Sequence, residues 1–288
     1  MRARFIGAVS IFLSCVLFAS TSTTVKYISA RYDGMSISLA RFVVGGVLAC
    51  IAIAVMRRGF RVTDFRSWAL RGIFGAVSMG LFYAGIQMTS SGRATLLADT
   101  YPVFVAVFGF LFFGESIGPG RIMGVTLGIA GSVIVFYDGS PYPLAGNLLC
   151  IGSAVTGAIA VHYLKKSRES HNSFLVYLSP CVFGAAASLW AAPGLVRVVS
   201  WHDAGFLAAV GVLAFGGQVL MSYGYRYVKA TEGSIVGMAE ILFSVMLSAA
   251  FLGEHMTSRF FAGGALVMAG LAVNQLDFVR AAYRRIVD

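Results

Sequence analysis

The amino-acid sequence predicts an all-α membrane protein that crosses the bilayer ten times. Of its 288 residues, 58% are hydrophobic and 12% are charged, and the mean hydropathy is +0.82. A soluble domain is typically about half apolar and about a quarter charged, so this chain has more apolar surface than a soluble fold could bury. The apolar residues also fall into runs of about 20, the length of a membrane-spanning helix.

Five apolar runs fill the first half of the chain. The first follows two arginines and resembles a secretory signal peptide, but similar runs recur to the end of the chain, so we interpret it as a retained span. Pro102 interrupts the fourth run and predicts a kink, because proline has no backbone N–H. Glycines at 120, 124 and 128 permit close helix packing in the fifth, within the chain or between two copies. The expected spans are 5–28, 35–56, 69–88, 94–113 and 121–137.

Five further runs fill the second half. A turn-rich segment at 138–143, with one glycine and two prolines, separates the halves. The remaining connections are short, so no separate soluble domain is expected. The expected spans are 144–164, 173–192, 204–225, 232–252 and 260–279.

The distribution of basic residues predicts the orientation. With a cytoplasmic N-terminus, 16 of the 22 Lys and Arg residues fall on the cytoplasmic side, 5 fall on the other side, and Arg41 lies inside a span. Positive charge is enriched on the cytoplasmic side of membrane proteins. Both termini are therefore expected in the cytoplasm. The net charge of +10 is interpreted in the same way, and nucleic acid is not an expected partner.

The two halves resemble each other weakly. A shift of 139 residues gives eight identities over 47 positions, namely Gly85/Gly224, Phe104/Phe243, Phe112/Phe251, Gly114-Glu115/Gly253-Glu254, Gly124/Gly263 and Ala130-Gly131/Ala269-Gly270. Because each half has an odd number of spans, the second half must be inverted relative to the first. We expect one repeat at 1–139 and another at 140–288, an architecture that recurs in secondary transporters.

Several stretches resemble the EamA-type members of the drug/metabolite transporter superfamily: Phe18-Ala-Ser, Lys26-Tyr27, Leu39-Ala-Arg41-Phe42, Tyr83-Ala-Gly, Thr89-Ser-Ser-Gly-Arg-Ala-Thr-Leu-Leu, Pro102-Val-Phe and Gly114-Glu115. The resemblance covers essentially the whole chain. It implies ten helices in two five-helix repeats and the export of small metabolites or drugs. The chain departs from the common pattern at Phe18, where the family often has tryptophan, and at Asp99, where it usually has a small or polar residue.

Asp99 lies within the fourth span, at a depth similar to that of Arg41 in the second. A charge at the bilayer centre costs about 2.5–3.5 kcal/mol, so each side chain should face a partner or a cavity. One hypothesis is a buried Asp99–Arg41 ion pair, with Lys26 extending to the interface. The other is that Asp99 contacts a substrate cation or a coupling proton, and the two can coexist.

Glu240 is the second intramembrane acid, in the ninth span. Under the 139-residue shift it aligns with Tyr101, two residues from Asp99, so the halves present carboxylates at nearly equivalent positions. No basic residue lies at a matching depth in the second half. Glu240 is therefore expected either to exchange protons during transport or to be a hydrogen-bonded structural acid.

Other polar residues have less certain roles. Gln218 lies in mid-span and could line a polar cavity with Tyr83, Tyr101 and Tyr223. Glu115 and Glu254 each end a span before a short turn and are expected to cap the amides of the following helix.

No cofactor or metal site is indicated. The four cysteines occur singly in apolar runs, and the chain has no metalloprotease, serine-hydrolase, Walker A or dinucleotide-binding motif. An enzyme is therefore not expected.

The function expected is secondary transport of a small metabolite by alternating access, across the cytoplasmic membrane of a bacterial-type cell. Export of an amino acid, an amino-acid derivative or an amine is favoured, with protons as the coupling ion and with a monomer or a homodimer as the working form. The alternatives are a proton-coupled multidrug cation exporter and, in another class, a membrane scaffold or an enzyme acting on lipid-linked substrates.

Overall fold

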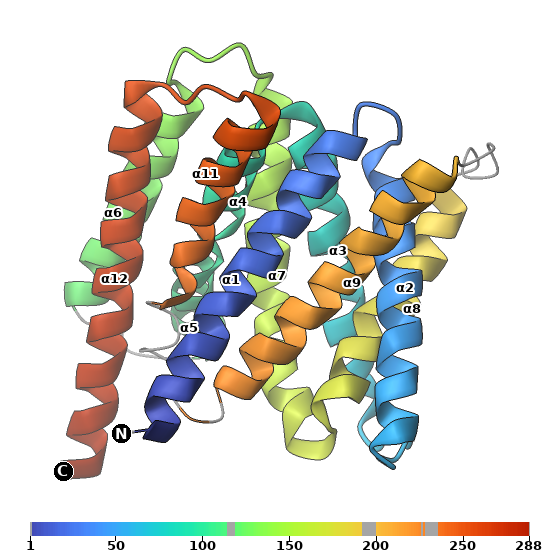
Figure 1. Cartoon of the computed structure of the whole chain (residues 1–288). Coiled ribbons are helices and arrows are strands. Elements are labelled where there is room, and N and C mark those ends of the chain that lie inside the picture. The colour runs from blue at the N-terminus through green and yellow to red at the C-terminus, as the bar shows by residue number, and fades with distance from the viewer. Residues whose placement is uncertain (1, 114–118, 192–199, 226, 228–235, 288) are drawn as a thin grey trace.

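The computed structural model is a bundle of helices, without β-strands in the residues that it describes (Figure 1). It describes residues 2–113, 119–191, 200–225, 227 and 236–287. Within these ranges six helices are long and apolar enough to cross a membrane, and they coincide with six of the predicted spans. The chain is therefore a multi-pass membrane protein. The six are α1 (Arg2–Ile28), α2 (Gly34–Val55), α3 (Phe65–Met88), α7 (Leu144–Ser170), α8 (Ser173–Ala191) and α9 (Trp201–Gly224).

Several of these helices begin at a residue that caps them. Asp33 accepts hydrogen bonds from the backbone N–H groups of Met35 and Ser36, and Ser200 accepts one from that of Asp203. Such caps satisfy amides that have no partner within the helix. Hydrophobicity therefore determines which segments are helical, and short polar side chains determine where these helices start.

The predicted span 94–113 is wrong as a single helix. The structure has α4 (Ser91–Ala98) and α5 (Tyr101–Phe113), separated at Asp99 and Thr100. Pro102 cannot donate to the carbonyl of Ala98, four residues earlier, so the helical ladder is interrupted there. The Thr100 hydroxyl donates to the carbonyl of Leu97 at 2.6 Å and satisfies one acceptor at the break.

A second interruption occurs in the other half. α11 (Ala239–Leu252) begins after a turn at Met238. Under the 139-residue shift, Met238 aligns with Asp99, so the two helix breaks occupy equivalent sequence positions. α11 ends at Gly253, whose φ of 63° is in the left-handed region that glycine tolerates best. The first residues of the predicted span 232–252 lie outside the described residues.

α6 (Pro119–Phe136) and α12 (Ser258–Val287) pack closely through glycine. A methyl group at Gly131 would lie 2.5 Å from the carbonyl oxygen of Gly263, and one at Gly270 would lie 2.6 Å from that of Gly124. Only glycine permits this approach of the two backbones. The glycines of the fifth span therefore pack helices within the chain.

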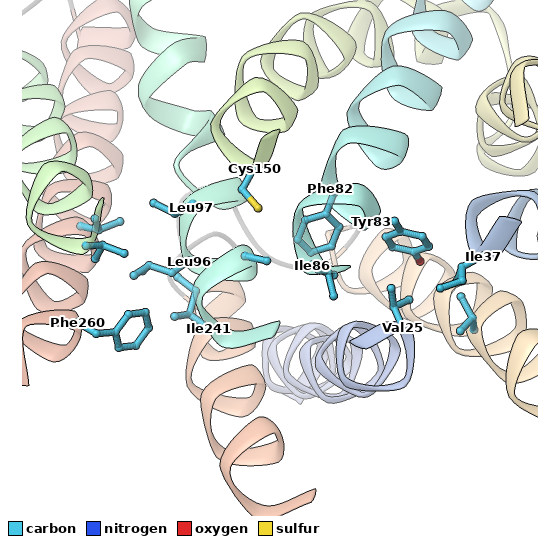
Figure 2. Close-up of a cluster of buried hydrophobic side chains, with 14 of the residues drawn as sticks. Val25, Ile37, Phe82, Tyr83, Ile86, Leu96, Leu97, Cys150, Ile241 and Phe260 are labelled. Carbon is cyan, nitrogen blue, oxygen red and sulfur yellow. The ribbon is translucent and has the colours of Figure 1, made fainter. Parts of the chain in front are cut away.

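The largest contacts join helices of different halves. α1 packs on α9 and α3 on α7, and these two pairs exchange under the 139-residue shift. The buried apolar cluster in Figure 2 likewise combines Phe82 and Leu96 from the first half with Cys150 and Ile241 from the second. The halves therefore share one core. Figure 1 shows the start of α1 and the end of α12 at the same end of the bundle.

Candidate functional site

The two helix breaks bring the intramembrane acids together. Asp99 is the C-cap residue of α4, and Glu240 lies in the first turn of α11. Both are half-buried, and their carboxyl groups are close enough to interact electrostatically. Tyr101 interacts with both acids. An acid in a first helical turn is favoured by the helix dipole, which helps to explain why Glu240 is held there.

Cys15 of α1 also interacts with both acids. Its thiol lies 3.5 Å from the carbonyl oxygen of Gly237 and 3.7 Å from that of Val236, both just before α11. These carbonyls are at the break, where the helical ladder is incomplete. α1 therefore contacts the second break directly, through a residue that the sequence marks only as apolar.

The predicted ion pair between Arg41 and Asp99 is wrong. No ion pair joins them in the described part of the chain, and the Arg41 guanidinium instead donates to the hydroxyl of Tyr83 at 2.7 Å. It also lies 5.4 Å from the centre of the Tyr83 ring. Arg41 does interact electrostatically with Glu240. Sequence spacing indicates the depth of a residue in the membrane but not its direction around the bundle, and Tyr83 of the adjacent α3 is the better-placed acceptor.

Arg71 and Tyr177 belong to the same region, and the sequence analysis does not identify them. The sequence places Arg71 at the cytoplasmic edge, but α3 begins at Phe65, so Arg71 lies nearly two turns inside the helix. Arg71 interacts electrostatically with Arg41 and with Tyr177 of α8. An arginine within the apolar part of a span is the signal that could have revealed it.

Lys26 and Glu254 stabilise helix ends on the opposite side of the bundle from the termini. The Lys26 ammonium donates to the carbonyl oxygens of Ile86 and Gln87 at the end of α3, at 3.2 and 3.4 Å. Glu254 accepts a hydrogen bond of 3.1 Å from the backbone N–H of Ser91. Glu254 therefore caps the start of α4, whereas the sequence predicts that it caps the following helix. Glu115 lies outside the described residues.

Arg93 and Asp138 form an ion pair, and both are almost fully buried. Arg93 lies between two of the predicted spans, so its position in the sequence predicts an external connection and not a buried site. Asp138 also accepts hydrogen bonds from Ser140 at 3.0 Å and from Thr257 at 2.9 Å. Burial alone would raise the pKa of Asp138, but these hydrogen bonds and the one from Arg93 outweigh it and hold the pKa below its ordinary value. The network joins α4 to the connection between α6 and α7 and to the connection between α11 and α12.

The other residues predicted to line a polar cavity lie apart from the two acids or contact other groups. Gln218 is partly buried in α9 and makes no hydrogen bond to either acid among the described residues. Tyr223 is 45% exposed and packs on Tyr227. Tyr225, two residues later, interacts with Tyr101 instead.

A cavity of about 280 Å³ lies between α5, α6 and α7. Thr100, Ser132 and Tyr137 contribute hydroxyl-bearing side chains to its lining, and its other lining residues are apolar. Neither Asp99 nor Glu240 lines it, although Thr100 is next to Asp99 in the chain. This cavity is therefore adjacent to the first helix break and separate from the acids.

Comparison with known proteins gives the family. Relatives include Solute carrier family 35 member G1 of Mus musculus, 28% identical over 283 residues, which cover 88% of this chain and 73% of that protein. The pseudopaline exporter CntI of Pseudomonas aeruginosa is 23% identical over 272 residues, which cover 91% of this chain and 93% of that protein. An uncharacterized transporter of Archaeoglobus fulgidus is 27% identical over 269 residues, which cover 93% of this chain and 95% of that protein.

A solved crystal structure shares the fold, with a TM-score of 0.65 and 18% identity over 97% of this chain and 98% of that one. The sequence model of the EamA-like transporter family matches residues 5–137 and, a second time, residues 144–275. Because these two matches cover nearly the whole chain, the protein belongs to the EamA-like transporter family.

Proposed function

We propose that the protein is a secondary active exporter of a small metabolite that carries an ammonium group, and that Glu240 carries the coupling proton. The observation that carries the proposal is the meeting of Asp99 and Glu240 at the two aligned helix breaks. Broken helices that meet at a repeat interface are typical of the substrate sites of secondary transporters.

The two acids interact electrostatically as a pair, and this supports an exchange of a proton for a substrate cation. Glu240 interacts with both Asp99 and Arg41. Two carboxylates in a site of low dielectric constant repel each other when both are ionised, so a substrate cation and a proton can compete for the pair. Release of the proton then favours binding of the cation, and return of the proton favours its release.

The proposal includes two inverted repeats and a cytoplasmic location for both termini. The exchange of helix contacts under the 139-residue shift supports the repeat, as do the two separate family matches. The excess of basic residues on one side supports the orientation. A bacterial-type cytoplasmic membrane is the proposed location. The exporter among the relatives supports the direction of transport.

The test uses purified protein in proteoliposomes and a radiolabelled mixture of the common L-amino acids together with putrescine and spermidine. Glu240→Gln preserves the shape of the side chain but cannot titrate. We expect it to abolish transport driven by a pH gradient while retaining exchange of labelled for unlabelled substrate. The matched control is Glu254→Gln, the same change in the connection that follows α11, which should retain gradient-driven transport. If Glu240→Gln accumulates substrate as the wild type does, the proton assignment is wrong.

A further inference from the structure

The guanidinium of Arg71 is inside the bundle without an acceptor. Its Nε is buried and unpartnered, and in the described part of the chain Arg71 makes neither a hydrogen bond nor an ion pair. Arg71 is partly exposed, but a buried N–H donor such as its Nε is costly to leave unsatisfied, and the other nitrogens of the guanidinium remain free to donate. The contacts of Arg71 within the protein therefore do not explain why a guanidinium is placed there.

The side chain of Arg71 also points away from the nearest membrane surface. A methyl group at Gly75, one turn further into the span, would collide with its Nη1 and lie 3.3 Å from Cβ of Pro180 in α8. Helical side chains normally tilt toward the N-terminus of the helix, which here would take the guanidinium toward the end of the bundle that holds the termini. Arg71 is instead folded toward the interior, against α8.

Two further groups with spare hydrogen-bonding capacity lie beside it. Arg41 interacts electrostatically with Arg71 and donates one hydrogen bond, to Tyr83. The Tyr177 hydroxyl belongs to a side chain that is 9% exposed, and it makes no well-formed hydrogen bond. Its polar neighbour is the thiol of Cys181, a weak partner. Two guanidinium groups and a phenol thus converge from α2, α3 and α8.

Arg41 links these donors to the acids electrostatically, because it interacts with Glu240 as well as with Arg71. The interior of the bundle therefore presents two acidic groups beside two basic ones. This arrangement complements a molecule that carries an ammonium and a carboxylate. It is a poor match for a simple amine, which has no carboxylate to accept hydrogen bonds from the two guanidinium groups.

We infer that Arg41, Arg71 and Tyr177 form a binding site for a carboxylate of the transported substrate, whose ammonium binds at Asp99 and Glu240. The inference rests on the proposed transport function and narrows it to amino acids and their carboxylate-bearing derivatives. Guanidinium groups bind carboxylates through paired, charge-assisted hydrogen bonds. Tyr177 would donate one more.

The test compares amino acids with the amines that lack only the carboxylate: lysine with cadaverine, ornithine with putrescine, arginine with agmatine, and phenylalanine with phenethylamine. Binding is measured as the rise in the thermal unfolding midpoint of the purified protein. We expect at least one amino acid to bind the wild type roughly 10- to 100-fold more tightly than its amine, the effect of losing one or two charge-assisted hydrogen bonds.

Variants assign the effect to the site. Arg71→Gln and Tyr177→Phe should reduce this preference for the amino acid, with little change in amine binding. Arg71→Lys, which keeps the charge, should retain part of the preference. Arg66→Gln is the matched control, because Arg66 is exposed in the first turn of the same helix. If Arg71→Gln does not fold, Tyr177→Phe and Arg71→Lys still measure the preference.

Several results would overturn the inference. Amines that bind as tightly as their amino acids, with gradient-driven transport still lost in Glu240→Gln, would eliminate the carboxylate site and leave the proposed function intact. The absence of binding and transport across the whole panel would contradict both. Stabilisation by nanodiscs containing phosphatidylglycerol and not by amino acids, lost in Arg71→Gln, would assign the guanidinium groups to a lipid phosphate.

Discussion

Arg93 is buried and Arg71 is partly buried within the bundle, yet their partners differ. Arg93 is 1% exposed, donates to the carbonyl of Val135 at 2.8 Å, pairs with Asp138 and lies over the rings of Tyr142 and Phe260. Arg71 has no such partners. The Nε of Arg93 is buried without a hydrogen-bond partner, as that of Arg71 is, but a carbonyl and a carboxylate satisfy the other two nitrogens of Arg93. A charge inside a span that has an ionic partner is explained by the fold, whereas one without such a partner is a candidate ligand group. The first arginine therefore belongs to the scaffold and the second to the proposed substrate site.

Removal of the negative charge at Asp138 should destabilise the protein. Asp138→Asn leaves the Arg93 guanidinium buried and unpaired, so we expect a loss of about 3–5 kcal/mol in the free energy of unfolding. Thermal unfolding of the purified protein measures it. The control is Asp203→Asn, whose partner Arg31 is 43% exposed on its side chain; an exposed pair contributes about 0–1 kcal/mol. Equal losses from the two variants would contradict the assignment.

The same carboxylate predicts a dependence of stability on pH. Because the pKa of Asp138 is lower in the folded protein than its ordinary value of 3.8, the folded state binds fewer protons than the unfolded state. The stabilisation is therefore present above pH 3.8 and is lost as the pH falls through the folded pKa. The unfolding midpoint of Asp138→Asn should fall less steeply than that of the wild type over this acidic range.

At this scale, the sequence was informative about residue type and depth. Asp99, Glu240 and Arg41 are identifiable because charges are costly in a span, and all three lie in one region of the structure. Their partners were not predictable, because a depth along one helix does not say which neighbouring helix a side chain faces. Arg71 and Arg93 were missed because they lie close to the ends of their apolar runs.

Among the helices, the interruptions matter most. α4 and α5 are separated at Asp99, and α11 begins at the equivalent position of the second half. Pro180 also lies inside a helix, α8, but there the hydroxyl of Ser179 donates to the freed carbonyl of Val176 at 3.0 Å and the helix continues. A proline therefore breaks a helix in one place and is accommodated in another.

Replacement of Pro102 tests whether the first break is needed for transport. Pro102→Ala restores an N–H donor for the carbonyl of Ala98 and favours one continuous helix. We expect stability to be retained or increased and transport of the amino-acid mixture to fall about 10-fold or more, because Asp99 is displaced. Pro180→Ala is the control and should transport normally. Wild-type transport by Pro102→Ala would show that the break is not required.

Element positions followed closely from apolar runs, since a span needs a minimum length whatever its packing. The break at Asp99 was predicted only as a kink. Whether a proline ends a helix depends on the neighbours available to its freed carbonyl, and these come from the folded structure.

For the molecule as a whole, the orientation in the membrane can be tested directly. We expect the connection at 138–143 to face the outside and that at 56–64 to face the cytoplasm. Pro141→Cys should react with an impermeant maleimide in intact cells, and Arg61→Cys only after permeabilisation; both positions are exposed, whereas Cys15, Cys150 and Cys181 are buried. The reverse pattern would contradict both the orientation and the charge rule that predicts it.

The glycine contacts between α6 and α12 bear on how the two halves assemble. Each contact joins Gly131 or Gly124 to the glycine of the second half that is not its own equivalent, namely Gly263 or Gly270. Two identical half-length chains inserted in opposite orientations would form the same pair of contacts. In the inverted repeat that we propose, the information for this contact is therefore contained in either half, and an antiparallel dimer of one half-length chain would hold the same seam.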